Sequence, residues 1–200
     1  MSQACPTRTG EIHRQTKETD IRVSLVLDGY GQTEIRTGVP FMDHMLTLLA
    51  VHGFFDLQVT AQGDIEVDGH HTVEDLGICL GQALKQALGD RPPVRRYGVA
   101  LVPMDEALVR VALDLANRPH LTYQVTVRDA KVGTFDTELA KEFLRALSLN
   151  GGLTMHVDMI RGENSHHIIE AAFKALGQAL DRATTLDPRL SGVLSSKGAL

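Results

Sequence analysis

The feature that most constrains the fold of this 200-residue chain is an internal repeat. The segment HHTVEDLGICLGQAL at 70–84 returns as HHIIEAAFKALGQAL at 166–180, with eight identical residues in fifteen. An earlier motif, E-x-x-I-R-V-x-L at 18–25, returns as E-x-x-V-R-V-x-L at 106–113. Self-similarity over segments of this length indicates one structural unit that is present twice. We therefore expect two related halves.

Hydrophobic periodicity gives the same order of elements in each half. The two E-x-x-[IV]-R-V-x-L motifs alternate in the manner of half-buried strands, and 55–62 and 153–160 are also rich in alternating apolar residues. Helical spacing occurs at 41–53, 70–84, 141–152 and 166–180. The predicted class is α+β, with two repeated β-β-β-α-β-α halves and helices packed on one face of the sheets. The expected boundaries are 1–92 for the first half, 93–186 for the second and 187–200 for a C-terminal tail, together one compact catalytic unit.

Composition indicates a globular, cytoplasmic protein. Hydrophobic residues make up 43% of the chain, no apolar stretch reaches membrane-spanning length, and the N-terminus lacks the pattern of a signal peptide. A net charge of -5 without a long basic run argues against nucleic acid as a partner. Cys5 and Cys79 are too few for a disulfide framework, so we expect both to be reduced thiols.

Both repeats open with the string His-His-x-x-Glu, at 70–74 and at 166–170. On a helix the first His and the Glu lie about 40° apart around the axis, so the two side chains can share one ion. The second His points about 60° away from that Glu on the other side, which suits a different ion or a different subunit. One such string alone could reflect hydrogen bonding at a helix start. Its duplication favours a metal site instead.

The two-fold repeat adds further ligands. His44 lies 26 residues before His70, and Glu142 lies 24 residues before His166, at the matching place in the matching helix. Each half then supplies four candidate ligands. One ion would take His44, His71, His166 and Glu170, and the other Glu142, His167, His70 and Glu74. Nitrogen and carboxylate ligands without thiolate suit Mn²⁺, Fe²⁺ or Zn²⁺ and leave positions open for substrate.

These residues belong to motifs that span nearly the whole chain: RQTKETDIRVSLVLDGYG, TGVPFMDHMLTLLAVHGFFDL, GDIEVDGHHTVEDLGICLGQAL, VPMDEALVRVALDL, NRPHL, GENSHHIIEAAFKAL and SSKG. In them the chain resembles the imidazoleglycerol-phosphate dehydratase family of histidine biosynthesis. The resemblance implies a lyase that removes water from D-erythro-imidazole glycerol phosphate to give imidazole acetol phosphate. It also implies two Mn²⁺ ions per active site, and active sites shared between the subunits of a large homo-oligomer of 24 chains.

The family pattern implies metal ligands at His44, His70, His71, Glu74, His166, His167 and Glu170. The chain departs from the pattern at Glu142, where well-known plant and enteric members carry His; a carboxylate is also a competent ligand for Mn²⁺. The resemblance assigns the acid/base role to Glu18. Elimination would proceed through a metal-stabilised imidazolate and a diazafulvene-like intermediate.

The resemblance also implies residues that bind the substrate. Phosphate would be bound by Arg96, Arg118, Lys174, Ser196 and Lys197, and the rest of the substrate by Glu18 and His52. Guanidinium and ammonium groups suit phosphate oxygens, although each of these residues taken alone is more typical of an ordinary solvated surface.

Two other classes of function remain open from the residues alone. A dinuclear metallohydrolase would use similar ligands around paired ions, but it would not require an imidazole ring in its substrate. A non-catalytic protein in which ions only join subunits would show metal-dependent assembly and no turnover. Substrate selectivity and turnover separate these alternatives.

Overall fold

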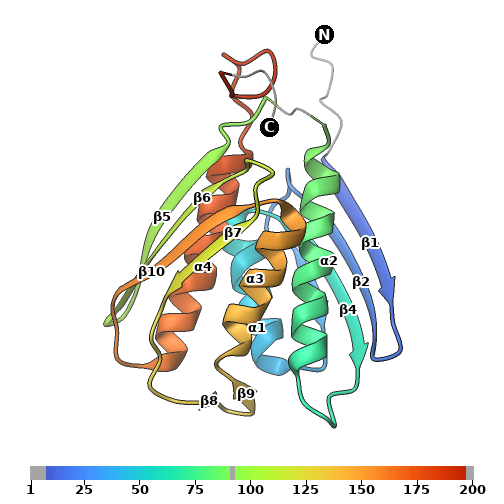
Figure 1. Ribbon diagram of the computed structural model, residues 1–200, viewed down its shortest axis with the longest axis vertical. Helices are drawn as coiled ribbons and strands as arrows, with labels where there is room; N and C mark the ends of the chain where they lie inside the picture. Colours follow the sequence, from blue (N-terminus) through green and yellow to red (C-terminus); the bar gives the residue numbers. More distant parts are fainter. Residues whose placement is uncertain (1–7, 91–92, 197–200) are drawn as a thin grey trace.

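The computed structural model describes residues 8–90 and 93–196 (Figure 1). The first half contains β1 (Thr9–Gln15), β2 (Thr19–Val26), β3 (Thr33–Arg36), α1 (Pro40–Gly53), β4 (Asp56–Gly63) and α2 (His70–Leu88). The second half contains β5 (Tyr97–Met104), β6 (Ala107–Asp114), β7 (His120–Gln124), α3 (Leu139–Gly151), β10 (Thr154–Arg161) and α4 (Ser165–Thr184). The predicted β-β-β-α-β-α order is confirmed in both halves. An unpredicted hairpin, β8 (Lys131–Val132) with β9 (Phe135–Asp136), is inserted before α3.

Each half forms one four-stranded sheet, and the two sheets have the same topology. The strand order is β1-β2-β4-β3 in the first sheet and β5-β6-β10-β7 in the second. In each sheet the last-named strand is parallel to its neighbour and the other pairs are antiparallel. The α+β class with duplicated halves, predicted from the repeats, is therefore confirmed.

The four helices lie between the two sheets (Figure 1). Helix α2 packs on β1 and β2, whereas α4 packs on β5 and β6. The helices also pack on each other across the halves, α1 against α4 and α2 against α3. Each sheet thus has helices on one face only, as predicted, and the central core joins both halves.

Side-chain alternation explains which face of each strand meets the helices. In β2, Ile21, Val23 and Leu25 are buried, and the residues between them face outward. Two glycines at matching places, Gly10 in β1 and Gly98 in β5, let the helices approach closely. A Cβ atom at Gly10 would lie 2.0 Å from the Ala83 carbonyl oxygen, and one at Gly98 would lie 1.8 Å from that of Ala179. Only glycine fits at either position.

All four helices begin at the same end of the molecule, which we call the N-terminal helix end (Figure 1). At the opposite end, the Arg96 backbone N–H donates to the Ala183 carbonyl oxygen (2.9 Å), close to the last turn of α4. From His166 to Ala183 the helix rises about 25 Å. Among the residues that the structure describes, no helix is long and apolar enough to cross a membrane.

Candidate metal centre

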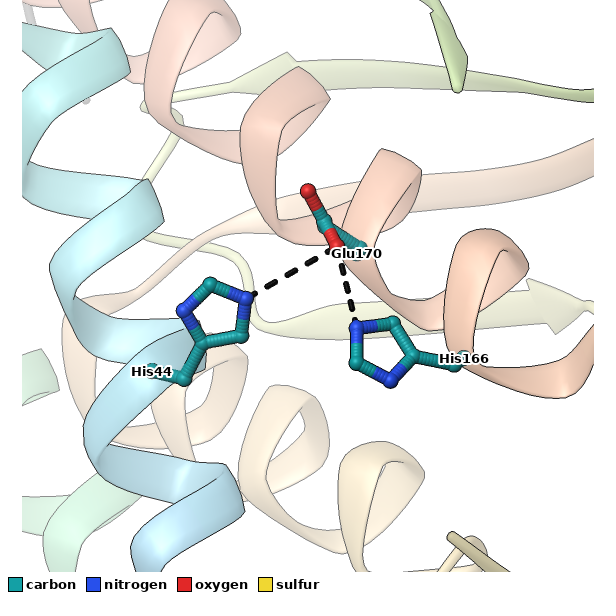
Figure 2. Close-up of side chains that lie close together, drawn as sticks. All are labelled: His44, His166 and Glu170. Carbon is teal, nitrogen blue, oxygen red and sulfur yellow. Dashed lines mark hydrogen bonds and ion pairs between the residues drawn. The ribbon is translucent and has the colours of Figure 1, made fainter. Parts of the chain in front are cut away.

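Helices α1 and α4 bring three predicted ligands together near the N-terminal helix end (Figure 2). Glu170 Oε2 lies 3.1 Å from His166 Nε2 and 3.7 Å from His44 Nε2. One ligand atom from each residue lies within 4.8 Å of the others. Within residues 8–90 and 93–196, this is the one group of three or more His, Cys, Asp or Glu side chains with the spacing of a metal site.

Local structure places the two ligands of α4. His166 and Glu170 are one helical turn apart, so their side chains lie on the same face, as the sequence predicted. The Asn164 side chain caps the helix and accepts the backbone N–H groups of His166 (2.9 Å) and His167 (3.3 Å). The cap fixes where α4 begins and therefore where both histidines point.

Glu170 is almost buried, with 7% of its surface exposed, and is held as a carboxylate. Lys174 Nζ lies 2.6 Å from Oε1, which leaves Oε2 facing the two histidines. Burial acts to raise the pKa of Glu170, but the hydrogen bond and charge of Lys174, with smaller contributions from His44 and His166, bring the pKa below its usual value. The group therefore carries the negative charge that a cation requires.

The charges of Lys174 and Glu170 also affect the pKa of His52, a predicted substrate contact. Its pKa is lowered mainly by burial and then by the nearby Lys174, while Glu170 acts in the opposite direction. The neutral imidazole is therefore favoured at His52.

The second histidine of each string points elsewhere. The His166 and His167 rings are inclined at 81° and the His70 and His71 rings at 88°, so neighbouring histidines diverge. The Nδ1 atom of His167 lies 2.7 Å from Glu106 Oε2, whereas that of His71 lies 3.0 Å from Asp64 Oδ2.

These carboxylates alter the electrostatics of the two histidines. The hydrogen bond that the His71 ring donates to Asp64 is the largest cause of a raised pKa at His71, and the one that the His167 ring donates to Glu106 is the largest cause at His167. In turn the backbone N–H of Asn164, the His167 ring and the backbone N–H of Glu163 lower the pKa of Glu106 to about 2. Each carboxylate is therefore a fixed acceptor for its histidine.

One chain does not complete either predicted set of four ligands. The first set has His44, His166 and Glu170 together, but His71 lies outside this group and contacts Asp64. Of the second set, Glu142 lies 3.5 Å from Arg145 Nη1. The described part of the chain does not gather Glu142, His70, Glu74 and His167 into a group like the first.

The donor atoms at His44, His166 and Glu170 suit a divalent ion of intermediate hardness. Two imidazole nitrogens and one carboxylate oxygen are typical ligands of Mn²⁺, Fe²⁺ and Zn²⁺. Three protein ligands leave positions for further ligands. The chemistry of this group thus fits a catalytic type of metal site better than a closed structural one.

Comparison with known proteins agrees with this geometry. The family model described as imidazoleglycerol-phosphate dehydratase matches residues 37–180. The chain belongs to this family. A dehydratase of that name from Syntrophobacter fumaroxidans is 60% identical over 193 residues, which cover 96% of this chain and 98% of the relative. The Bacillus subtilis member is 57% identical over 193 residues, which cover 96% of this chain and the whole relative.

A solved structure supports the fold as well. The crystal structure of imidazoleglycerol-phosphate dehydratase from Staphylococcus aureus superposes with a TM-score of 0.81 at 43% identity, over 90% of this chain and 99% of that one.

The predicted phosphate-binding residues are divided between the two ends of the dehydratase-family chain. Lys174 lies at the metal centre, where its Nζ is 2.6 Å from Glu170 Oε1 and 3.4 Å from Met104 Sδ. Arg96 lies at the opposite end, where its guanidinium donates to Asp114 Oδ1 (2.6 Å) and Oδ2 (3.0 Å) and to the Leu194 carbonyl oxygen (2.6 Å). The Asp114 hydrogen bond is the main cause of a raised pKa at Arg96.

Two further residues predicted to bind phosphate, Arg118 and Ser196, lie in the same part of the chain as the partners of Arg96. Arg118, with a 73% exposed side chain, is 4.0 Å from Asp114 Oδ2. Ser196 is exposed two residues after Leu194. Lys197 and Cys5 lie outside the described residues.

The sequence analysis did not identify Asp64 and Glu106, the two carboxylates that contact His71 and His167. Glu106 carried a signal, since it is the repeat mate of Glu18, but spacing alone gave it no role. Asp64 is the first residue after β4 and belongs to the motif GDIEVDGHHTVEDLGICLGQAL, but no role was predicted for it from the sequence.

Proposed function

We propose that the chain catalyses the dehydration of D-erythro-imidazole glycerol phosphate to imidazole acetol phosphate in histidine biosynthesis, with two Mn²⁺ ions per active site. The observation that carries this proposal is the His44–His166–Glu170 group in a chain of the dehydratase family. Bound metal would supply a Lewis acid at the imidazole ring and favour its imidazolate form. The cytoplasmic location stays a prediction.

The chain's own residues would bind the substrate and move its proton. In the elimination one carbon loses a hydroxyl and its neighbour loses a proton, which leaves an enol that becomes the ketone of the product. Glu18 is suited to carry this proton because its carboxylate is 55% exposed and lies 3.9 Å from His71 Nδ1. Arg118 and Ser196 are exposed to bind the phosphate.

Distance within one chain supports an active site that is shared between subunits. Glu18 and the paired histidines lie at the N-terminal helix end, whereas Arg96 and Arg118 lie beside the far end of α4 (Figure 1). The separation of about 25 Å along α4 is far longer than an imidazole ring with a three-carbon phosphate ester. We propose that the phosphate-binding end of one chain meets the metal-binding end of another, in the 24-subunit oligomer implied by the family resemblance.

Mixed assemblies test this arrangement. Glu18→Gln and Arg118→Ala are each expected to lower turnover strongly when present in every subunit. When the two variants are co-expressed in equal amounts, randomly mixed oligomers should recover about one quarter of wild-type turnover, because that fraction of shared sites draws both intact residues from different chains. Oligomers of the two variants that are purified separately and then combined without subunit exchange are the control. No recovery in the mixed oligomers would place both residues in the same chain's site.

Metal removal tests the reaction itself. Protein stripped of metal with a chelator should form no imidazole acetol phosphate, and added Mn²⁺ should restore turnover. Hydrolysis of substrates without an imidazole ring would favour the dinuclear hydrolase. Metal-dependent assembly without any turnover would favour the non-catalytic, metal-joined oligomer.

A further inference from the structure

Glu18 and Glu106 occupy the same place in the two halves, yet their carboxylates have different contacts. Each is the residue immediately before the second strand of its sheet. The Glu106 carboxylate accepts the backbone N–H groups of Glu163 (3.1 Å) and Asn164 (2.8 Å) and lies 2.7 Å from His167 Nδ1. The Glu18 carboxylate accepts no hydrogen bond from the residues that the structure describes, and its approach to His71 is 3.9 Å.

A different carboxylate takes the place of Glu18 at His71. Asp64, the first residue after β4, lies 3.0 Å from His71 Nδ1, and its backbone N–H donates to the Glu18 carbonyl oxygen (3.2 Å). The first residue after β10 is Gly162, which has no side chain to offer His167. In both halves the Nδ1 atom of the second histidine is therefore hydrogen-bonded to one carboxylate, but that carboxylate comes from a different loop.

From this difference between the halves we infer that Glu106 and Asp64 are positioning residues. Glu106 holds His167, and Asp64 holds His71, in the form that carries its proton on Nδ1, so that Nε2 is the atom available to bind metal. A histidine that donates one ring N–H to a carboxylate has a fixed tautomer and ring orientation, and its other nitrogen is the more basic ligand. Because Asp64 performs this role in the first half, the Glu18 carboxylate accepts no hydrogen bond from the described residues and only approaches His71 at 3.9 Å. The duplicated position has thus become structural in one half and available for proton transfer in the other.

The inference rests on the proposed function only in taking His71 and His167 as metal ligands. Its alternative is that Glu106 merely closes the loop before α4 through the N–H groups of Glu163 and Asn164. Glu106→Gln separates the two, because the amide oxygen can still accept these N–H groups but no longer places a negative charge on His167. Because the variant keeps this acceptor, a role limited to loop closure predicts an unchanged melting temperature of the metal-free protein and unchanged Mn²⁺ affinity. A positioning role predicts weaker Mn²⁺ binding.

The experiment is a Mn²⁺ titration of chelator-stripped protein by calorimetry, combined with turnover at saturating Mn²⁺. Glu106→Gln and Asp64→Asn should each bind Mn²⁺ about 10–100-fold more weakly, and excess Mn²⁺ should restore much of their turnover. Glu18→Gln should keep wild-type Mn²⁺ affinity and lose turnover at every Mn²⁺ concentration. Glu163→Gln is the matched control, since it removes one charge from the same turn without touching His167.

The outcomes are distinguishable. Wild-type affinity in both Glu106→Gln and Asp64→Asn would overturn the inference, as would equal loss of affinity in Glu163→Gln. If the wild-type protein binds Mn²⁺ without dehydrating the substrate, the proposed function fails, and the affinity measurements still decide the positioning roles.

Discussion

Replacing Glu170 with Gln is expected to lower turnover by more than about 100-fold and to weaken Mn²⁺ binding by at least as much. Glu170 is the residue through which His44, His166 and Lys174 are connected, and it supplies the only negative charge of that group. This loss should exceed the roughly 10–100-fold loss of metal affinity or activity that is typical when a residue that only orients a ligand is replaced. Loss of the carboxylate also leaves the Lys174 ammonium, with a 16% exposed side chain, without its ion-pair partner. Calorimetric Mn²⁺ titration and steady-state turnover measure the two losses.

Glu34→Gln provides the matched control for this change. Glu34 lies in β3, is 61% exposed and is 3.2 Å from the exposed Arg36, so the same chemical substitution there should leave both quantities unchanged. A Glu170→Gln protein with near-normal Mn²⁺ affinity would remove Glu170 from the metal centre.

Replacing Gly98 with Ala is expected to lower the free energy of unfolding by about 3 kcal/mol, near the upper end of the usual cost of an overpacked core. The added Cβ would meet the Ala179 carbonyl oxygen at 1.8 Å and the Ala183 Cβ at 3.2 Å. The closest atom belongs to the backbone, so α4 must move away from β5 to accommodate the change. Urea unfolding at fixed protein and Mn²⁺ concentration measures the difference.

Gly192→Ala is the control for the stability measurement. Among the described residues other than its chain neighbours, none has a heavy atom within 4 Å of a Cβ built there, and the backbone is not in the left-handed region. The expected change is within about 0.5 kcal/mol. A Gly98→Ala protein as stable as Gly192→Ala would mean that α4 and β5 do not approach as closely as described.

The fold was predictable because the periodic segments are long and occur twice. The repeats at 70–84 and 166–180 have helical spacing throughout, and the structure extends them to α2 and α4. The β8–β9 hairpin was missed because each of its strands has two residues, too few for any periodicity. Its strands are defined by pairing across the chain and not by local sequence.

The metal centre was predictable only where ligands share an element or a repeat position. Spacing on one helix predicted the pair His166 and Glu170, and the two-fold repeat added His44 from a different helix. The contacts of Glu106 and Asp64 depend on loops that approach from other parts of the sheets. The partners of Arg96 likewise come from β6 and the C-terminal segment. No local pattern in the sequence encodes such tertiary approaches.

The packing of α1 on α4 and of α2 on α3 has a consequence for how this chain could have arisen. A single half would leave the apolar faces of its two helices, which pack on helices of the other half, without cover. Such a half would need an identical copy to bury them, so the chain has the architecture of a symmetric dimer joined into one polypeptide. In a true homodimer every substitution appears twice. Joining the copies removed that restriction, and equivalent positions such as Glu18 and Glu106 became free to evolve apart.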